Sequence, residues 1–198
     1  GRRQCMNKWL GIFAAGLICT FLVVGCKKYE PVLPPDIKLN SNPVEKYKVI
    51  LNIRNPPFPI RVTGEATYGI SNTGRCVPID SRRSLGGSRP HFRKTVELAV
   101  RKVSENTYEM FFYADSVKHE NYFGKGVCEW SGSPAYRIHW SGSTYAITSG
   151  RRVEPGEAVT RVCGSKPSHP IGSCVNEEYA KNASPETHFY YEITTYKE

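Results

Sequence analysis

The sequence predicts a mainly β fold, an antiparallel β-sandwich or small barrel with long loops, preceded by an apolar signal helix and a Pro-rich tether. Three observations predict it. Apolar and polar residues alternate in most segments after residue 45, which is the period of a strand with one buried face. Helical periodicity is almost absent, and its best candidate is a short turn over residues 175–183. The connections between alternating segments are mostly short, as in antiparallel sheets.

The alternating segments indicate about eight to ten strands, a number typical of a sandwich or barrel. The first strand begins near Glu45 and places Val49, Leu51 and Ile53 on one face. Prolines at residues 56–59 end it. Further strands are expected at 60–70, 95–103, 108–112, 127–130, 136–140, 145–147 and 188–196.

Two local patterns indicate where strands turn. Ser104-Glu105-Asn106 separates two alternating segments and is the clearest hairpin in the chain. Trp-Ser-Gly-Ser occurs at residues 130–133 and again at 140–143. One pair is too little for a repeat architecture. We interpret each copy as a strand end whose Trp packs inward and whose Ser-Gly-Ser forms a turn.

The N-terminal segment has the pattern of an export signal. Residues 1–5 precede Met6 and are interpreted as lying upstream of the start. Lys8 is followed by an uncharged apolar run, Trp9–Val24, which is shorter than the roughly 20 residues that a membrane-spanning helix needs. The run ends in Val-Val-Gly-Cys, which resembles the lipobox of bacterial prolipoproteins. The resemblance implies cleavage after Gly25 and lipidation of Cys26; an uncleaved anchor helix and a plain secretory signal are the alternatives.

These assignments divide the chain into three parts: a leader at residues 1–25, a lipidated Pro-rich tether at 26–44 and a β-domain at 45–198. Removing 25 of the 198 residues leaves 173, which suits one domain with a tail. Residue 27 is Lys. In the lipoproteins that the motif resembles, a residue other than Asp at this position implies the outer membrane, here on its periplasmic face.

The chain is basic, with 27 Lys and Arg against 18 Asp and Glu. Loss of Arg2, Arg3 and Lys8 with the leader leaves 24 basic residues, and hence a net charge of +6. Nucleic acid is the usual partner of a basic protein, but export takes the chain away from it. An acidic protein or an anionic membrane surface fits better.

Four of the seven cysteines fall in the predicted domain: Cys76, Cys128, Cys163 and Cys174. An even number in an exported chain predicts disulfides. Three pairings are possible, and the sequence does not decide among them. We favour Cys163–Cys174, which closes a short loop, with Cys76–Cys128 by elimination. No C-x-x-C and no nearby His pair supports a zinc site.

Motifs of catalysis are lacking. The sequence has no G-x-S-x-G, no H-E-x-x-H and no phosphate-binding P-loop. Asp115 and Glu120 could form a carboxylate pair for glycoside hydrolysis, but their segment resembles a polar loop more than a catalytic site. We therefore predict no enzymatic activity, no metal and no cofactor.

Two long basic loops, residues 79–94 and 150–169, are candidate binding segments, because binding residues concentrate on loops of a rigid scaffold. The first surrounds Gly86-Gly87 and is a solvated loop, a protein contact or a small-anion site. Three rings, Tyr113, Tyr122 and Phe123, are hard to place in the core and suggest an exposed aromatic anchor. The predicted partner-binding residues are Arg82, Arg83, Arg89, His91, Tyr122 and Phe123.

One stretch resembles a known group of proteins. Its motifs are Tyr68–Asn72, Cys76–Pro78, Leu85–Gly87, Tyr122–Gly124 and Gly126–Trp130. They are similar to those of small periplasmic lipoproteins encoded beside type VI secretion phospholipase effectors. The resemblance covers about Tyr68 to Gly142. Members of that group act as immunity proteins, so it implies that this chain binds a phospholipase-like toxin and blocks it.

The sequence thus predicts a non-enzymatic, lipid-anchored inhibitor of a toxic effector in the periplasm. Two disulfides would stiffen the domain, as an inhibitor requires. The alternative is a structural or assembly lipoprotein of a cell-envelope apparatus. A hydrolase is a third hypothesis, which would require Asp115, His119 and Glu120 to meet in a cleft.

Overall fold

The computed structural model describes residues 31–54, 56, 59–81, 87–140, 143–148, 156, 158–164, 174–175 and 188–198. The predicted leader and Cys26 lie outside these residues, as does most of the turn predicted at 175–183. Within them, no helix is both long enough and apolar enough to cross a membrane.

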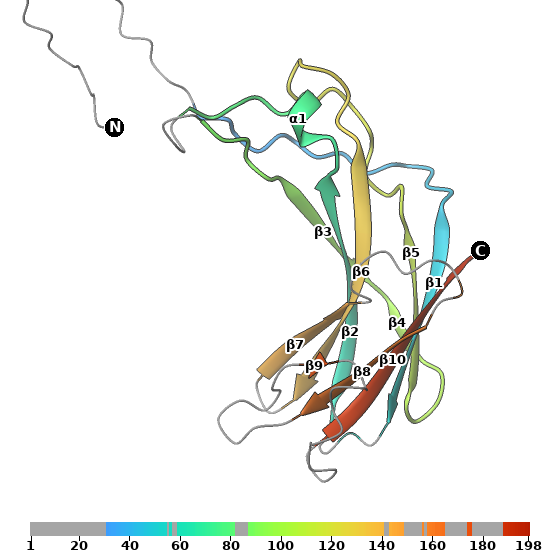
Figure 1. The fold of residues 1–198 in the computed structure, drawn as a ribbon. Coiled ribbons are helices and arrows are strands. Elements are labelled where there is room, and N and C mark those ends of the chain that lie inside the picture. The colour runs from blue at the N-terminus through green and yellow to red at the C-terminus, as the bar shows by residue number, and fades with distance from the viewer. Residues whose placement is uncertain are drawn as a thin grey trace, which may run out of the picture.

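The strands form two antiparallel sheets that pack face to face without closing into a barrel (Figure 1). The six-stranded sheet has the order β4 (Val100–Lys102), β5 (Thr107–Tyr113), β1 (Lys46–Arg54), β10 (His188–Lys197), β8 (Ala158–Gly164) and β9 (Cys174–Val175). The four-stranded sheet has the order β3 (Arg93–Leu98), β2 (Arg61–Ile70), β6 (Trp130–Trp140) and β7 (Ser143–Thr148). The predicted mainly β fold is confirmed, in its sandwich form.

The core lies between the two sheets and uses the alternation that the sequence predicts. Val49, Leu51 and Ile53 of β1 are almost fully buried, as expected for one face of a strand. From the other sheet, β6 contributes Tyr136 and Ile138. The Tyr136 hydroxyl donates a hydrogen bond of 2.6 Å to the Val49 carbonyl oxygen, so the core also contains a polar link between the sheets.

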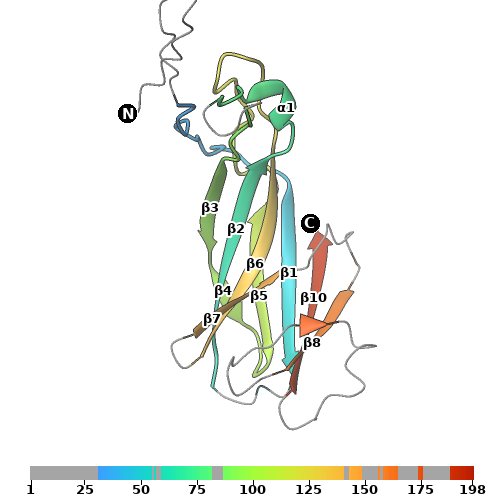
Figure 2. The same cartoon turned by 60° about the vertical axis from the view of Figure 1, so that its left-hand side comes forward.

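Residues 95–103, predicted as one strand, belong to two sheets. The chain pairs with β2 as β3, passes Ala99 and then pairs with β5 as β4 (Figure 2). This switch joins the sheets along one side of the sandwich. The predicted hairpin at residues 104–106 is confirmed, with the Val103 amide donating to the Thr107 carbonyl at 2.8 Å.

The prediction that the first Trp-Ser-Gly-Ser segment ends a strand and turns is wrong. Its residues 131–133 do not turn but continue β6, and the strand predicted at 127–130 begins only at Trp130. The reason is pairing with β2, which runs without interruption from Ile70↔Trp130 to Arg61↔His139. Gly132 is needed because the Tyr68 ring lies over it; a Cβ there would be 2.3 Å from Tyr68 Cε1.

Candidate functional site: the disulfide-bonded loop end

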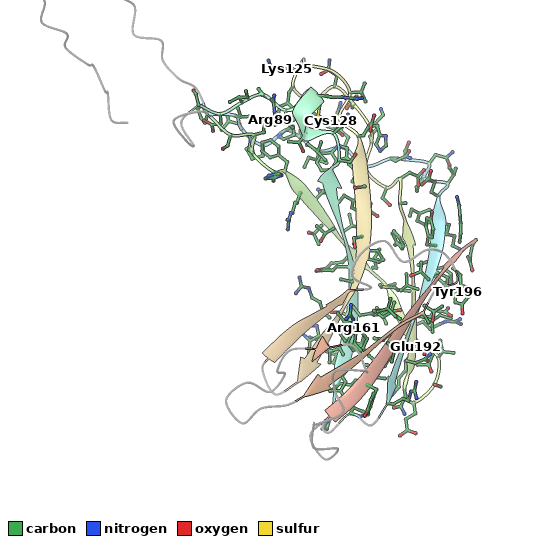
Figure 3. The ribbon with its side chains drawn as sticks, viewed as in Figure 1. Arg89, Lys125, Cys128, Arg161, Glu192 and Tyr196 are labelled. Atoms are coloured by element: carbon green, nitrogen blue, oxygen red, sulfur yellow. A yellow bond between two sulfur atoms is a disulfide. The ribbon has the colours of Figure 1, made fainter. Side chains whose placement is uncertain are left out.

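The longest described connections gather at one end of the sandwich (Figures 1 and 3). They are the described parts of the β2–β3 connection, residues 71–81 and 87–92, and the β5–β6 connection, residues 114–129. The N-terminal residues 31–45 run across the same end. We call these three segments the loop end. It contains the described members of the predicted partner-binding set.

A disulfide joins the two connections. Cys76 closes the short helix α1 (Thr73–Cys76) and bonds to Cys128, which confirms one of the predicted pairs. Both cysteines are fully buried and pack with Val77 in a small apolar cluster separate from the main core. Phe92 and Phe123 stack beside this cluster, with ring centroids 5.3 Å apart. The cross-link therefore lies inside its own small core, which stiffens both connections.

Asn72 fastens the same two connections by hydrogen bonds. Its side-chain oxygen accepts from the Glu129 amide at 2.9 Å, and its side-chain nitrogen donates to the Val127 carbonyl, also at 2.9 Å. Beside it, the Ser71 amide donates to the Glu129 carbonyl at 2.9 Å. Because these bonds link residues more than 50 positions apart, they hold the loops in one relative position.

The predicted basic loop is closed by a backbone bridge. Asp80 and Ser88 exchange both amide hydrogen bonds, at 2.8 and 3.1 Å. The Arg89 guanidinium, half-buried, donates to the Val77 carbonyl, which ties the base of the loop to the disulfide cluster. His91 is exposed. Arg82 and Arg83 lie outside the described residues, so their predicted role stays a prediction.

Tyr122 and Phe123 are half-buried and not an exposed anchor. The Tyr122 ring meets Trp130 edge-on at 6.0 Å, and its hydroxyl donates to the Lys118 carbonyl at 2.8 Å. Burial raises the pKa of Tyr122. Phe123 packs against the disulfide cluster. Internal packing therefore accounts for both rings, and their contact with a partner stays a prediction.

Part of the predicted tether is packed on the domain. Residues 36–45, which we call the strap, form a backbone bridge between Leu39 and Val117. The Asn40 amide donates to the Ser116 carbonyl at 2.8 Å, and the Lys118 amide donates to the Lys38 carbonyl at 3.0 Å. The strap is thus held to the β5–β6 connection by one antiparallel bridge.

Asp115 fixes the far end of the strap. Its carboxylate accepts from the Val44 amide at 2.9 Å and from the Glu45 amide at 3.1 Å. Nearby, Lys38 pairs with Glu120 at 3.0 Å, which raises the pKa of Lys38. His119 Nε2 lies 3.0 Å from the Trp130 carbonyl oxygen. The three residues weighed for hydrolysis therefore each have a structural partner.

The loop end exposes side chains that sequence reasoning did not single out. Arg75 and Lys125 are exposed cations, and Lys125 lies at the extreme of the molecule (Figure 3). Ile79 and Val127 are apolar and expose 55% and 54% of their surface. All four lie within three residues of a disulfide cysteine, which is the one signal in the sequence that points to them.

The other cysteine pair is described only by its backbone. β8 and β9 pair so that Cys163 lies directly opposite Cys174. Residues directly opposite in an antiparallel pair have Cα atoms about 4.5–5.5 Å apart, inside the range that a disulfide spans. The bond itself stays a prediction, because these side chains lie outside the described structure. Among the described residues, no group of three or more His, Cys, Asp or Glu is arranged to hold a metal ion.

Comparisons with known proteins add no further information, since no family model, no curated protein and no solved structure matches this chain.

Proposed function

We propose that this chain is a lipid-anchored periplasmic protein that binds and inhibits a toxic effector, of the phospholipase class, delivered by type VI secretion. The effector class comes from the resemblance of residues 68–142 to immunity lipoproteins. The lipid anchor comes from the lipobox-like pattern that ends at Cys26. The inhibitor binds through its loop end and carries out no chemistry itself.

The observation that carries the proposal is the cross-linking of the two connections at the loop end. Two connections from different parts of the chain are joined by the Cys76–Cys128 disulfide and by the hydrogen bonds of Asn72. A surface that is ordered before binding loses less conformational entropy when a partner docks. It also mixes exposed apolar and cationic side chains, the composition of a binding patch more than of an inert surface.

A specific observation favours the second candidate, a structural or assembly lipoprotein. The outer face of the six-stranded sheet exposes Phe111 and Tyr196, by 37% and 42%. Lys46 lies over the Phe111 ring at 4.3 Å, and Lys48 over the Tyr196 ring at 5.7 Å. Exposed rings on a sheet are a surface that another subunit can cover.

The test is capture followed by inhibition. The chain with Cys26→Ser is expressed in the periplasm of its own strain, with the secretion system induced, and its bound proteins are identified. The expected result is a stoichiometric lipase whose hydrolysis of phospholipid stops when the chain is added. Envelope machinery without a lipase would favour the second candidate, and Phe111→Ala/Tyr196→Ala should then abolish its capture.

A matched pair of variants locates the binding surface. Arg75→Glu/Lys125→Glu reverses the charge at the loop end, while Arg54→Glu/Lys102→Glu does so at exposed positions near the other end of the sandwich. Only the loop-end pair should weaken capture of the lipase. Equal capture by both variants would assign binding to another surface.

A further inference from the structure

We propose that the outer face of the four-stranded sheet carries an oxyanion site, where Arg61 binds the phosphate group of a ligand and His139 takes up a proton when that group is bound. The site lies at the start of β2 and the end of β6, at the end of the sandwich away from the loop end (Figure 1). It requires neither a lipid anchor nor an effector, so it goes beyond the proposed function and is independent of it.

The pairing of β2 with β6 brings four polar side chains together. Arg61 lies directly opposite His139, and Thr63 lies directly opposite Arg137. The sequence neighbours of Arg137 are buried in the core, so Arg137 and His139 lie on the other, outer face of β6. Cβ atoms of directly opposite residues are about 4.5–5.5 Å apart, and those of diagonal residues about 7–8 Å apart. The four side chains are therefore within reach of one small ligand.

This patch has more positive than negative charge. Glu65, the next residue along the same face of β2, accepts two hydrogen bonds of 2.7 Å from the Arg137 guanidinium. Arg61 is exposed, and within the described part of the chain no acid forms an ion pair with it. The strand on the other side of His139 is β7, whose sequence contains no acidic or basic residue. The guanidinium of Arg61 is therefore the group that can receive a ligand anion.

The charge of the patch acts on His139. Its Nε2 lies 2.8 Å from the Thr63 hydroxyl oxygen. Desolvation, and after it the positive charges of Arg61 and Arg137, lower the pKa of the imidazole. An oxyanion on Arg61 offsets this repulsion and so favours the imidazolium. By linkage, the same anion binds more tightly as His139 becomes protonated, which happens at lower pH.

The geometry of the patch favours a phosphate group as the ligand. A guanidinium presents parallel N–H donors that match two oxygens of a phosphate or a carboxylate. Positive charge also reaches the site from β6, so a tetrahedral group with further oxygens meets more of it than a planar carboxylate does. Like charges directly opposite each other destabilise a sheet. The Arg61–His139 pair therefore costs stability when both side chains are charged, and a bound phosphate removes that cost.

The experiment follows the His139 imidazole by NMR in the chain with Cys26→Ser, with inorganic phosphate as the ligand. Sodium chloride holds the ionic strength constant, so general screening is the same in every sample. We expect saturable chemical-shift changes at His139, and a higher pKa of His139 in phosphate than in chloride. His91, exposed at the loop end, should show neither effect. The absence of a saturable change at His139, or an equal change at His91, would overturn the site.

Two matched variants test the residue that carries the proposal. Arg61→Gln should abolish the phosphate effect and, because a repelling charge is removed, raise the pKa of His139 in chloride. Arg93→Gln removes an exposed arginine from β3 of the same sheet and should change neither result. Persistence of the phosphate effect in Arg61→Gln, or an equal loss in Arg93→Gln, would show that Arg61 does not bind the anion.

The same titration distinguishes two sources of the phosphate group. Glycerol 3-phosphate represents a soluble ester, and a short-chain phosphatidic acid below its micelle concentration represents a lipid headgroup. Tighter binding of the lipid would assign the site to a headgroup, equal affinity would assign it to a soluble ester, and binding of neither would overturn the proposal. None of these measurements involves an effector, so failure of this site and failure to capture a lipase are separate results.

Discussion

At the scale of single residues, two buried tyrosines connect the facing sheets by hydrogen bonds of their hydroxyl groups. Tyr68 and Tyr136 are fully buried in the four-stranded sheet, and each donates a hydrogen bond of 2.6 Å to a backbone oxygen of the facing sheet, at Tyr113 and Val49. Burial is the main cause that raises the pKa of both phenols, because a phenolate would lose its hydration there.

These shifts predict loss of stability in alkali. Below pH about 10 the two phenols are protonated in both the folded and the unfolded chain, so the folded protein has its full stability. Above pH about 10 the unfolded chain releases these protons while the folded chain keeps them, and the free energy of unfolding falls. Tyr136 should add a slope of up to about 1.4 kcal/mol per pH unit, and Tyr68 contributes in the same direction. Urea unfolding between pH 9 and 11.5 checks this. Tyr136→Phe should make the decline shallower, whereas Tyr196→Phe at an exposed position should not; equal slopes in all three proteins would contradict the assignment.

Asp115 is the residue on which the strap depends most. Asp115→Ala removes the acceptor of the Val44 and Glu45 amides. The expected cost is about 1–3 kcal/mol in the free energy of unfolding, together with faster hydrogen exchange at those two amides. Asp36→Ala, at an exposed position on the same segment, should stay within about 0.5 kcal/mol. A similar cost for both variants would mean that the carboxylate does not hold the strap.

At the scale of elements, the β2–β6 pair depends on a glycine facing a ring. Gly132→Ala would push a methyl group into the buried Tyr68 ring, which is packed and cannot move away freely. We expect a loss of about 1–3 kcal/mol, the usual cost of overpacking. Gly69→Ala is the matched control, since a Cβ there meets nothing within 4 Å. Thermal unfolding of both variants measures the difference, and equal melting temperatures would refute the close contact.

The β8–β9 pair makes the remaining disulfide testable. The register that sets Cys163 opposite Cys174 predicts that they are bonded in the oxidised protein. Peptide mapping without reduction should recover one linked peptide containing these two cysteines and a second containing Cys76 and Cys128. A free thiol at Cys163 or Cys174 would show that the prediction is wrong.

At the scale of the whole molecule, the Cys76–Cys128 bond spans 52 residues and so constrains much of the unfolded chain. The loop-entropy relation gives about 4 kcal/mol for a loop of this length. Cys76→Ala/Cys128→Ala should lower the free energy of unfolding by up to about that amount, measured by urea denaturation. A loss below about 1 kcal/mol would mean that the reduced chain keeps the two connections together.

Much of the fold follows from local patterns in the sequence. Alternation identified β1, β5 and β10 and the buried face of β1, because a strand with one face in the core must repeat every two residues. The turn residues at 104–106 located the hairpin. Export, the lipid anchor and the inhibitor role remain predictions from sequence.

Tertiary structure decided what depends on distant residues. Tyr47 pairs with Lys197, β3 and β4 enter different sheets, and residues 131–133 stay in a strand because β2 pairs with them. The candidate site follows the same rule. The sequence offered no core for Tyr122 and Phe123, because the disulfide cluster that they pack against is formed by two distant segments. Alternation is a property of neighbouring residues, whereas pairing partners and exposure are set by contacts between segments far apart in the chain, which no local pattern encodes.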